Sequence, residues 1–320
     1  MPILNKKLSV IASIVILWAV TAILLVISIK QNQGHLVYAL YDAYIHMAIA
    51  KNFAQNGIWG VTKYGFSSSS SSLLYTLLIS VIYFLTGVNE VTPFIINVIF
   101  ATFIIFLVFI IIRHYEPGFF WSLMVLLSVI FFTPLPALIF SGMEHTLQIL
   151  LNISFVYFSA IILSKEKATR LESSFLLILA FLVTSVRYEG LFLILVVSIL
   201  FILKKKQLYP LFLLTAGIAP LAIYGIISIV NGWFFLPNSV LLKSNFLLYP
   251  GITRFLFHFA GQVIKNPHIL VLVSLSAALL ILQYKKQKKI WKDTTVMLII
   301  FIATALLHMV FARNGWFFRY

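Results

Sequence analysis

Long apolar runs separated by short polar segments make up most of the chain. Runs of about 20 residues, the length needed to cross the core of a bilayer, recur along it. The clearest are residues 8–29, 208–230, 268–284 and 294–311. At least four more apolar segments lie between residues 73 and 163, with breaks near residues 89–90, 113–118 and 133–143. The pattern predicts an all-α polytopic membrane protein with about 9–11 transmembrane or re-entrant helices, since a barrel would show short alternating segments instead.

The amino-acid composition supports this class and removes some chemistry. Hydrophobic residues make up 62% of the chain and charged residues only 10%, whereas soluble domains have roughly 25% charged residues. The first apolar run is too long for the core of a signal peptide and no clear cleavage site follows it, so we interpret it as an uncleaved span. The chain has no cysteine, which excludes disulfides, cysteine nucleophiles and zinc thiolates.

Positive charge predicts the topology. More than half of the 23 lysines and arginines lie in clusters beside apolar runs, at residues 6–7, 165–170, 204–206 and 285–292. Such clusters mark cytoplasmic loops, so we interpret the net charge of +15 as a sign of topology and not of nucleic-acid binding. With the N-terminus inside, residues 30–72 and 231–266 become two outer loops of a single transmembrane domain, residues 1–320, in the bilayer of the plasma (inner) membrane.

The first outer loop carries the pattern of an amphipathic helix. Four apolar residues share a face at helical spacing, namely Tyr44, Met47, Ala48 and Phe53. Asp42 stands where a helix N-cap is expected and Gly57 where a C-cap is expected. We expect this helix to lie on the membrane surface.

The sequence pattern of residues 174–203 predicts a helical hairpin. They form an apolar stretch of about 30 residues with cytoplasmic-type charges on both sides, interrupted by SVRYEG at residues 185–190. One helix would hold Arg187 and Glu189 inside the membrane at a cost of several kcal/mol. Two short helices would instead place SVRYEG at the tip of a hairpin, in a cavity lined by protein. Arg187 and Glu189 are there either for function or simply to pair with each other.

Three acids and several cations fall at the outer face in this topology. The acids are Asp42, Glu144 and Glu189, and the cations are Arg187, Lys243, Arg313 and Arg319. Arginine binds phosphate in bidentate fashion, and a carboxylate serves as a general base toward a hydroxyl. Together they suit transfer of a group from a lipid-linked phosphate to an alcohol.

Five segments of the chain resemble, in the same order, the motifs of one enzyme family. They are YDAYIHMAIAKNFAQNGIWGV with the serine-rich FSSSSSSLLYTLLIS, SGMEHTLQILL, SVRYEGLFLIL, FFLPNSVLLK and GWFFRY. The chain is similar in these segments to GT-C-type glycosyltransferases, which are integral membrane enzymes that use polyprenyl-phosphate sugars. The segments cover essentially the whole chain. The resemblance implies a GT-C-like fold with a long first outer loop that carries an amphipathic helix.

The resemblance also implies a reaction and a set of site residues. A sugar would pass, with inversion, from a polyprenyl-phosphate donor to a hydroxyl of an extracytoplasmic acceptor, which is a glycan, a lipid or a protein. Asp42 matches the second loop aspartate of the family and is the expected base. Substrate binding is implied for His46, Glu144, Arg187, Glu189, Asn238, Lys243, Arg319 and Tyr320, of which Arg319, Lys243 and Arg187 would hold the phosphate. Tyr41 replaces the first aspartate of the family, which weakens but leaves open a Mg²⁺ or Mn²⁺ cofactor, and no metal ligand is assigned.

Simpler interpretations stand beside these. Asp42 is also explained as an N-cap, and Glu144 as an acid that stabilises the start of a helix. For the six serines we favour a flexible rim of the loop. His46 shares a helix face with Asp42 and either orients this acid or merely pairs with it.

Two other functions also remain open. One is a transporter or flippase of a lipid-linked or anionic substrate, although the inverted repeats typical of transporters are not visible in the sequence. The other is a degenerate, non-catalytic relative of the transferases. The chain stops at Tyr320 directly after an aromatic and basic segment, which favours a longer native protein.

Overall fold

The polypeptide is helical throughout its regular structure. A computed structural model describes residues 2–205, 208–238, 241, 260, 261, 264, 267–287 and 289–311, and in these residues all regular secondary structure is helical. The chain divides into two compact units, Met1–Ile153 and Ser154–Tyr320, and the division falls within helix α7 (His145–Ser164). The predicted all-α class is therefore confirmed.

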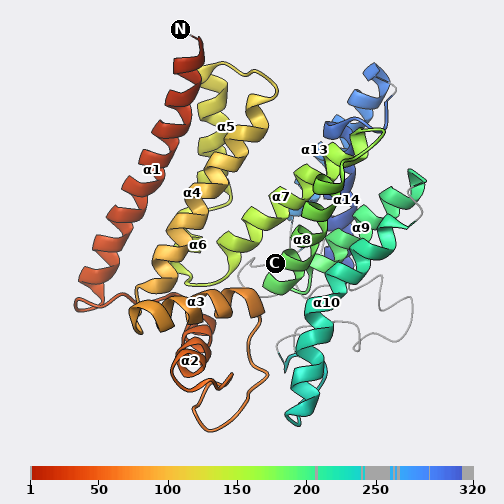
Figure 1. Ribbon diagram of the computed structural model, residues 1–320. Helices are drawn as coiled ribbons and strands as arrows, with labels where there is room; N and C mark the ends of the chain where they lie inside the picture. The colour runs from red at the N-terminus through yellow and green to blue at the C-terminus, as the bar shows by residue number, and fades with distance from the viewer. Residues whose placement is uncertain are drawn as a thin grey trace. The chain divides into compact units, whose positions relative to one another are not determined.

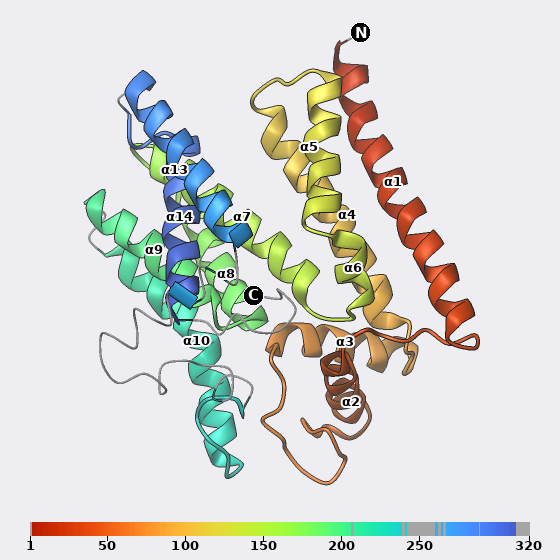
Figure 2. The ribbon, with the colours of Figure 1, turned by 180° about the vertical axis from the view of Figure 1, so that it is seen from behind.

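The first unit combines a bundle of long helices with two shorter helices at one end. The bundle consists of α1 (Pro2–Gln31), α4 (Thr92–Arg113), α5 (Phe119–Phe132) and α6 (Leu135–Phe140). At one end of it α3 (Leu73–Thr86) lies crosswise, and α2 (Tyr41–Asn56) packs on the far side of α3 (Figures 1 and 2). The polar segment near the start of the chain is thus held against one end of the bundle through α3.

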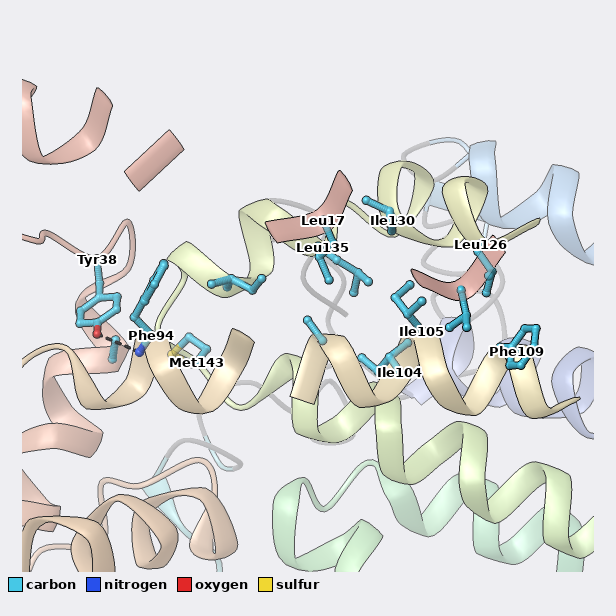
Figure 3. Close-up of a cluster of buried hydrophobic side chains, with 14 of the residues drawn as sticks. Leu17, Tyr38, Phe94, Ile104, Ile105, Phe109, Leu126, Ile130, Leu135 and Met143 are labelled. Atoms are coloured by element: carbon cyan, nitrogen blue, oxygen red, sulfur yellow. Dashed lines mark hydrogen bonds between the residues drawn. The ribbon is translucent and has the colours of Figure 1, made fainter. Parts of the chain in front are cut away.

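An apolar core holds the bundle of the first unit together. Leu17, Ile104, Leu126 and Leu135, from four different helices, are completely buried and face one another (Figure 3). The core continues toward the loop before α2, where the Tyr38 hydroxyl accepts a hydrogen bond from the backbone N–H of Phe94 (3.1 Å) and donates one to the carbonyl of Glu90. Burial raises the pKa of Tyr38 well above its usual value. The hydroxyl therefore stays neutral and serves as donor and acceptor at once.

The second unit contains the hairpin that the sequence predicts. Helices α8 (Arg170–Val186) and α9 (Gly190–Leu203) are separated by residues 187–189, the break expected at SVRYEG. Helix α10 (Tyr209–Val230) packs against both arms of the hairpin. Helix α13 (Pro267–Gln287) packs against α14 (Asp293–Phe311), and α14 packs against α9.

Seven helices of the described residues are long and apolar enough to cross a membrane. They include α1, α10, α13 and α14, at the four clearest runs of the sequence, and α5 with α6 counts as one of the seven. Helices α3 and α9 are apolar but shorter. These helices suggest a multi-pass membrane protein in a lipid bilayer.

One detail predicted for α2 is wrong, namely its N-cap. The residue before the helix is Leu40, without a side-chain cap, and Asp42 lies inside the first turn; Gly57, with φ of 67°, is the C-cap as predicted. The predicted apolar face is distinct from the face that is buried in the protein. The buried residues are Ala43, His46, Ile49 and Ala50, whereas Tyr44 is 42% exposed and Phe53 38%. Tyr44 and Phe53 are thus left on the surface of the protein, where the membrane contact predicted for this helix would need them.

Candidate functional site

Three separate segments of the first unit meet at the side chain of His46. The imidazole comes from α2 and is only 1% exposed. Its Nδ1 lies 2.7 Å from the hydroxyl of Thr76 on α3, and its Nε2 lies 3.3 Å from Oε2 of Glu144, which is completely buried. The loop helix and the SGMEH segment, far apart in the sequence, are therefore in direct contact. Buried acids and histidines are stable only with such partners, because burial of an unpaired charge or polar group is costly.

The serine run lines this contact. Ser68, Ser70 and Ser72 are buried, and the serines between them are half-buried, so the run alternates as an extended chain does. The Ser70 hydroxyl lies 3.0 Å from the Thr76 hydroxyl and 3.4 Å from His46 Nδ1. The favoured interpretation of this run as a flexible rim is therefore wrong: the small hydroxyl side chains pack inward and contact the imidazole.

The turn that carries Glu144 is fixed from two sides. Asn97 on α4 donates from its amide to the carbonyl of Met143 (3.1 Å), and the Tyr75 hydroxyl donates to the carbonyl of Gly142 (3.1 Å). Gly142 has φ of 65°, and a Cβ at this position would lie 2.5 Å from the Tyr38 ring. Only glycine fits this backbone and this close approach. As predicted, Glu144 stands at a helix start, since α7 begins at the next residue.

The order of atoms around His46 decides what the cluster can do. Oγ of Ser71 lies 3.3 Å from His46 Nε2 and 3.3 Å from Oε1 of Glu144. In a Ser–His–acid relay the serine and the acid occupy opposite nitrogens of the ring. Here both occupy the same side, and Thr76 holds the other nitrogen. The arrangement is suited to fixing the imidazole and not to activating Ser71 as a nucleophile.

Asp42 lies one helical turn before His46 on α2. Its side chain is half-buried, and the preceding Tyr41 is 63% exposed. Residues four apart share a helix face, so the fixed imidazole also fixes the part of α2 that presents Asp42. Among the described residues no group of three or more histidine, aspartate or glutamate side chains could hold a metal ion.

The hairpin tip of the second unit carries a separate ion pair. Nη2 of Arg187 lies 2.9 Å from Oε1 of Glu189, and Nε lies 3.4 Å from Oε2. Arg187 is 5% exposed and Glu189 30%. The two residues pair with each other, which is one of the two interpretations that the sequence left open.

The remaining predicted site residues are less informative. Asn238 is half-buried and follows the buried Pro237 in the second unit. Lys243, Arg319 and Tyr320 lie outside the described residues. The structure thus brings His46 to Glu144, brings Arg187 to Glu189, and places Asp42 beside the first of these pairs.

Sequence reasoning missed the residues that hold His46 and Glu144 in place. The sequence does not point to Thr76, Tyr75 or Asn97, each of which is completely buried at the site. Asn97 had a usable signal, because a lone amide in an apolar run of membrane-spanning length must find partners inside the protein. Thr76 had none, since a threonine in a short apolar segment is equally common as a filler of the core.

Comparison with known proteins adds no assignment: no protein-family model, no curated protein and no solved structure matches the chain.

Proposed function

We propose that the chain is a membrane glycosyltransferase of the GT-C type, which transfers a sugar from a polyprenyl-phosphate donor to a hydroxyl of an extracytoplasmic acceptor. One observation carries the proposal. Three segments on which the resemblance rests, namely the helix that carries Asp42, the serine run and SGMEH, converge on His46 in the first unit. Convergence of motif segments on one buried group is expected if the motifs build a site.

In the proposed reaction Asp42 is the general base. Its carboxylate accepts the proton of the acceptor hydroxyl, whose oxygen attacks the anomeric carbon of the sugar. The bond between this carbon and the phosphate oxygen breaks, and the polyprenyl phosphate leaves with its electron pair. Attack from the face opposite to the phosphate inverts the anomeric configuration.

The other site residues have supporting roles in this proposal. His46 and Glu144 are too deeply buried to reach a substrate in this conformation, so we assign them to positioning α2 and Asp42, in place of substrate binding. Arg187, Lys243 and Arg319 are proposed to hold the phosphate, with Glu189 orienting Arg187 through their two contacts. The polar loop of α2 supports an outward-facing site on the plasma membrane, by the distribution of lysine clusters.

The test is sugar transfer in proteoliposomes. Wild type, Asp42→Asn and Tyr41→Asp are each supplied with a panel of radiolabelled polyprenyl-phosphate sugars and a membrane extract as acceptor. Glu90→Gln serves as the matched control, because Glu90 is an exposed acid of the same unit. We expect transfer by wild type and Glu90→Gln and its loss in Asp42→Asn, by a factor of about 10²–10⁴, the usual contribution of a general base.

Other outcomes would contradict parts of the proposal. Full transfer by Asp42→Asn would show that Asp42 is not the base. Transfer by Tyr41→Asp alone would identify the chain as a degenerate relative whose lost acid is restored by the substitution, which is the second candidate function that Tyr41 favours. Absence of sugar transfer in every variant with every donor would count against the proposed glycosyltransferase activity.

A further inference from the structure

Three connections of the second unit converge on the side chain of Lys204. Its ammonium group donates to the backbone carbonyls of Leu163 and Lys165 at the end of α7. It also lies 5.7 Å from the centre of the Trp291 ring, in the connection between α13 and α14. Lys204 itself belongs to the α9–α10 connection. These contacts place the α7–α8, α9–α10 and α13–α14 connections at the same end of the unit (Figure 2).

This end of the second unit is strongly positive. Its described residues 164–172, 204–205, 285–287 and 289–293 contain nine lysines and arginines and three acids. One of the acids, Glu172, is paired with Lys165. Several of the lysines are exposed, among them Lys205 and Lys289. We call the four ranges together the basic end.

Lys205 occupies a position that its backbone does not favour for lysine. Its φ is 60°, in the left-handed region that glycine adopts most readily. It follows the C-terminus of α9, and its N–H donates to the carbonyl of Ile202 (2.8 Å), a closure that glycine would make equally well. The turn therefore does not explain a lysine here, whereas an exposed ammonium group at the basic end does.

The basic end also has the apolar groups of a membrane interface. Ile290 is 47% exposed and Trp291 is half-buried, and they stand between Lys289 and Lys292. Tryptophan beside lysine is typical of the level at which lipid headgroups lie. This composition is the one expected of a segment whose cations lie at the level of lipid phosphate groups.

We propose that the basic end is a binding surface for the headgroups of anionic phospholipids. The phosphodiester charge pairs with the exposed ammonium groups, and Ile290 and Trp291 contact the glycerol and the first methylene groups of the lipid. The positive-inside rule alone is a weaker explanation of this surface. It requires positive charges in the cytoplasmic loops, but it requires neither that three connections meet at Lys204 nor that a lysine stands at position 205. The proposal is independent of the proposed transferase activity.

The test measures lipid binding to the purified full chain in neutral detergent by native mass spectrometry. The probes are dioleoyl phosphatidylglycerol and dioleoyl phosphatidylcholine, with inorganic phosphate and a short DNA duplex as competitors. The variants are Lys205→Gly and Lys289→Gln, alone and together, and Lys63→Gln is the matched control because it removes an exposed lysine of the first unit. Lys205→Gly is a safe variant, since glycine suits the left-handed turn.

We expect phosphatidylglycerol to bind more tightly than phosphatidylcholine. Each of the two substitutions should weaken its binding about fivefold, in line with the usual contribution of one lysine near an anionic membrane surface. Lys205→Gly should at the same time keep or raise the midpoint of thermal unfolding, because it relieves the left-handed lysine. Lys63→Gln should leave lipid binding unchanged.

Four results would overturn the proposal. They are equal binding of the two lipids, a loss in Lys63→Gln as large as in the Lys205 and Lys289 variants, complete displacement of the lipid by millimolar inorganic phosphate, and tighter binding of DNA than of lipid. The third would identify a site for small anions, and the fourth a nucleic-acid surface.

Discussion

Each unit of the protein holds an acid against a basic side chain, but the two pairs are built in different ways. In the first unit His46 and Glu144 come from distant segments, and both are buried. In the second unit Arg187 and Glu189 are two residues apart in one turn, and Glu189 is 30% exposed. The first pair therefore depends on the packing of α2, α3 and the α6–α7 turn, whereas the second depends on the local turn between α8 and α9.

The difference shows what each pair does for the structure. A contact between distant segments restrains the chain only after the unit has folded, so it adds to the stability of the whole unit. A contact within one turn mainly restrains that turn. Removal of one member of the pair should therefore cost more stability in the first unit than in the second.

The largest effect is expected from Glu144→Ala. It leaves a buried imidazole without its acid, and removal of one partner of a buried pair costs about 3–5 kcal/mol. The free energy of unfolding, measured by titration with sodium dodecyl sulfate in mixed micelles, checks this value. Glu90→Ala removes an exposed acid of the same unit and should change little. A cost for Glu144→Ala as small as that of the control would mean that the pair adds nothing.

Gly142→Ala should be next, at about 2–4 kcal/mol. An added Cβ meets the Tyr38 ring at 2.5 Å and Ala43 at 2.9 Å, and φ is 65°, so overpacking and left-handed strain add. Two further variants, measured by the same titration, separate the cost of overpacking from the cost of the left-handed backbone. Gly57→Ala has the positive φ but nothing within 4 Å, and Gly65→Ala has neither problem. The loss of stability should be largest for Gly142→Ala, smaller for Gly57→Ala and smallest for Gly65→Ala. Equal losses for the first two variants would show that the Tyr38 side chain moves to make room for the added Cβ.

Glu189→Ala should cost less than Glu144→Ala, about 1–2 kcal/mol. It removes hydrogen bonds to a charged group, which are worth about 1.5–3 kcal/mol, and the partial exposure of Glu189 lowers this value. The free energy of unfolding is again measured by titration with sodium dodecyl sulfate. A cost above that of Glu144→Ala would reverse the comparison and show that the hairpin tip carries more of the stability than its local geometry suggests.

The smallest effect on stability is expected from the ion pair between Lys165 and Glu172, which lies near the surface of the second unit. The Lys165 ammonium, with the backbone N–H of Thr169, lowers the pKa of Glu172 from 4.5 to about 2. The pair therefore stabilises the fold above pH 4.5, and its contribution is lost as the pH falls toward 2. Thermal unfolding of wild type and Glu172→Gln in detergent should show a small difference at pH 7 that shrinks below pH 4.5. A difference that does not depend on pH would rule out this ionisation.

The sequence predicts the helices well and their contacts poorly. Apolar runs locate α1, α10, α13 and α14 within a few residues, because helices in a membrane form from local periodicity and length. The break between α8 and α9 is predicted for the same local reason, as charges are expensive within a span. The face of α2 that packs within the protein is not predicted, because its contacts with α3 and with Glu144 depend on tertiary packing.

The candidate site shows the same limit. The sequence points to His46 and Glu144 separately, but nothing in it pairs them, since their contact depends on tertiary packing. The sequence does offer the pairing of Arg187 with Glu189 as an alternative, because the two are near neighbours. The role of Asn97 requires the α6–α7 turn to be in place before its hydrogen bonds can be recognised.

The serine run has a consequence for how this protein tolerates sequence change. Six identical letters stand at residues 67–72, yet only Ser68, Ser70 and Ser72 are buried. Replacement by a larger residue should thus be rejected at the three buried positions and accepted at Ser67 and Ser69. Ser71 is half-buried but contacts His46 and Glu144, so it should also resist replacement. A stretch that looks like a simple repeat in the sequence is therefore subject to steric limits that differ from one residue to the next.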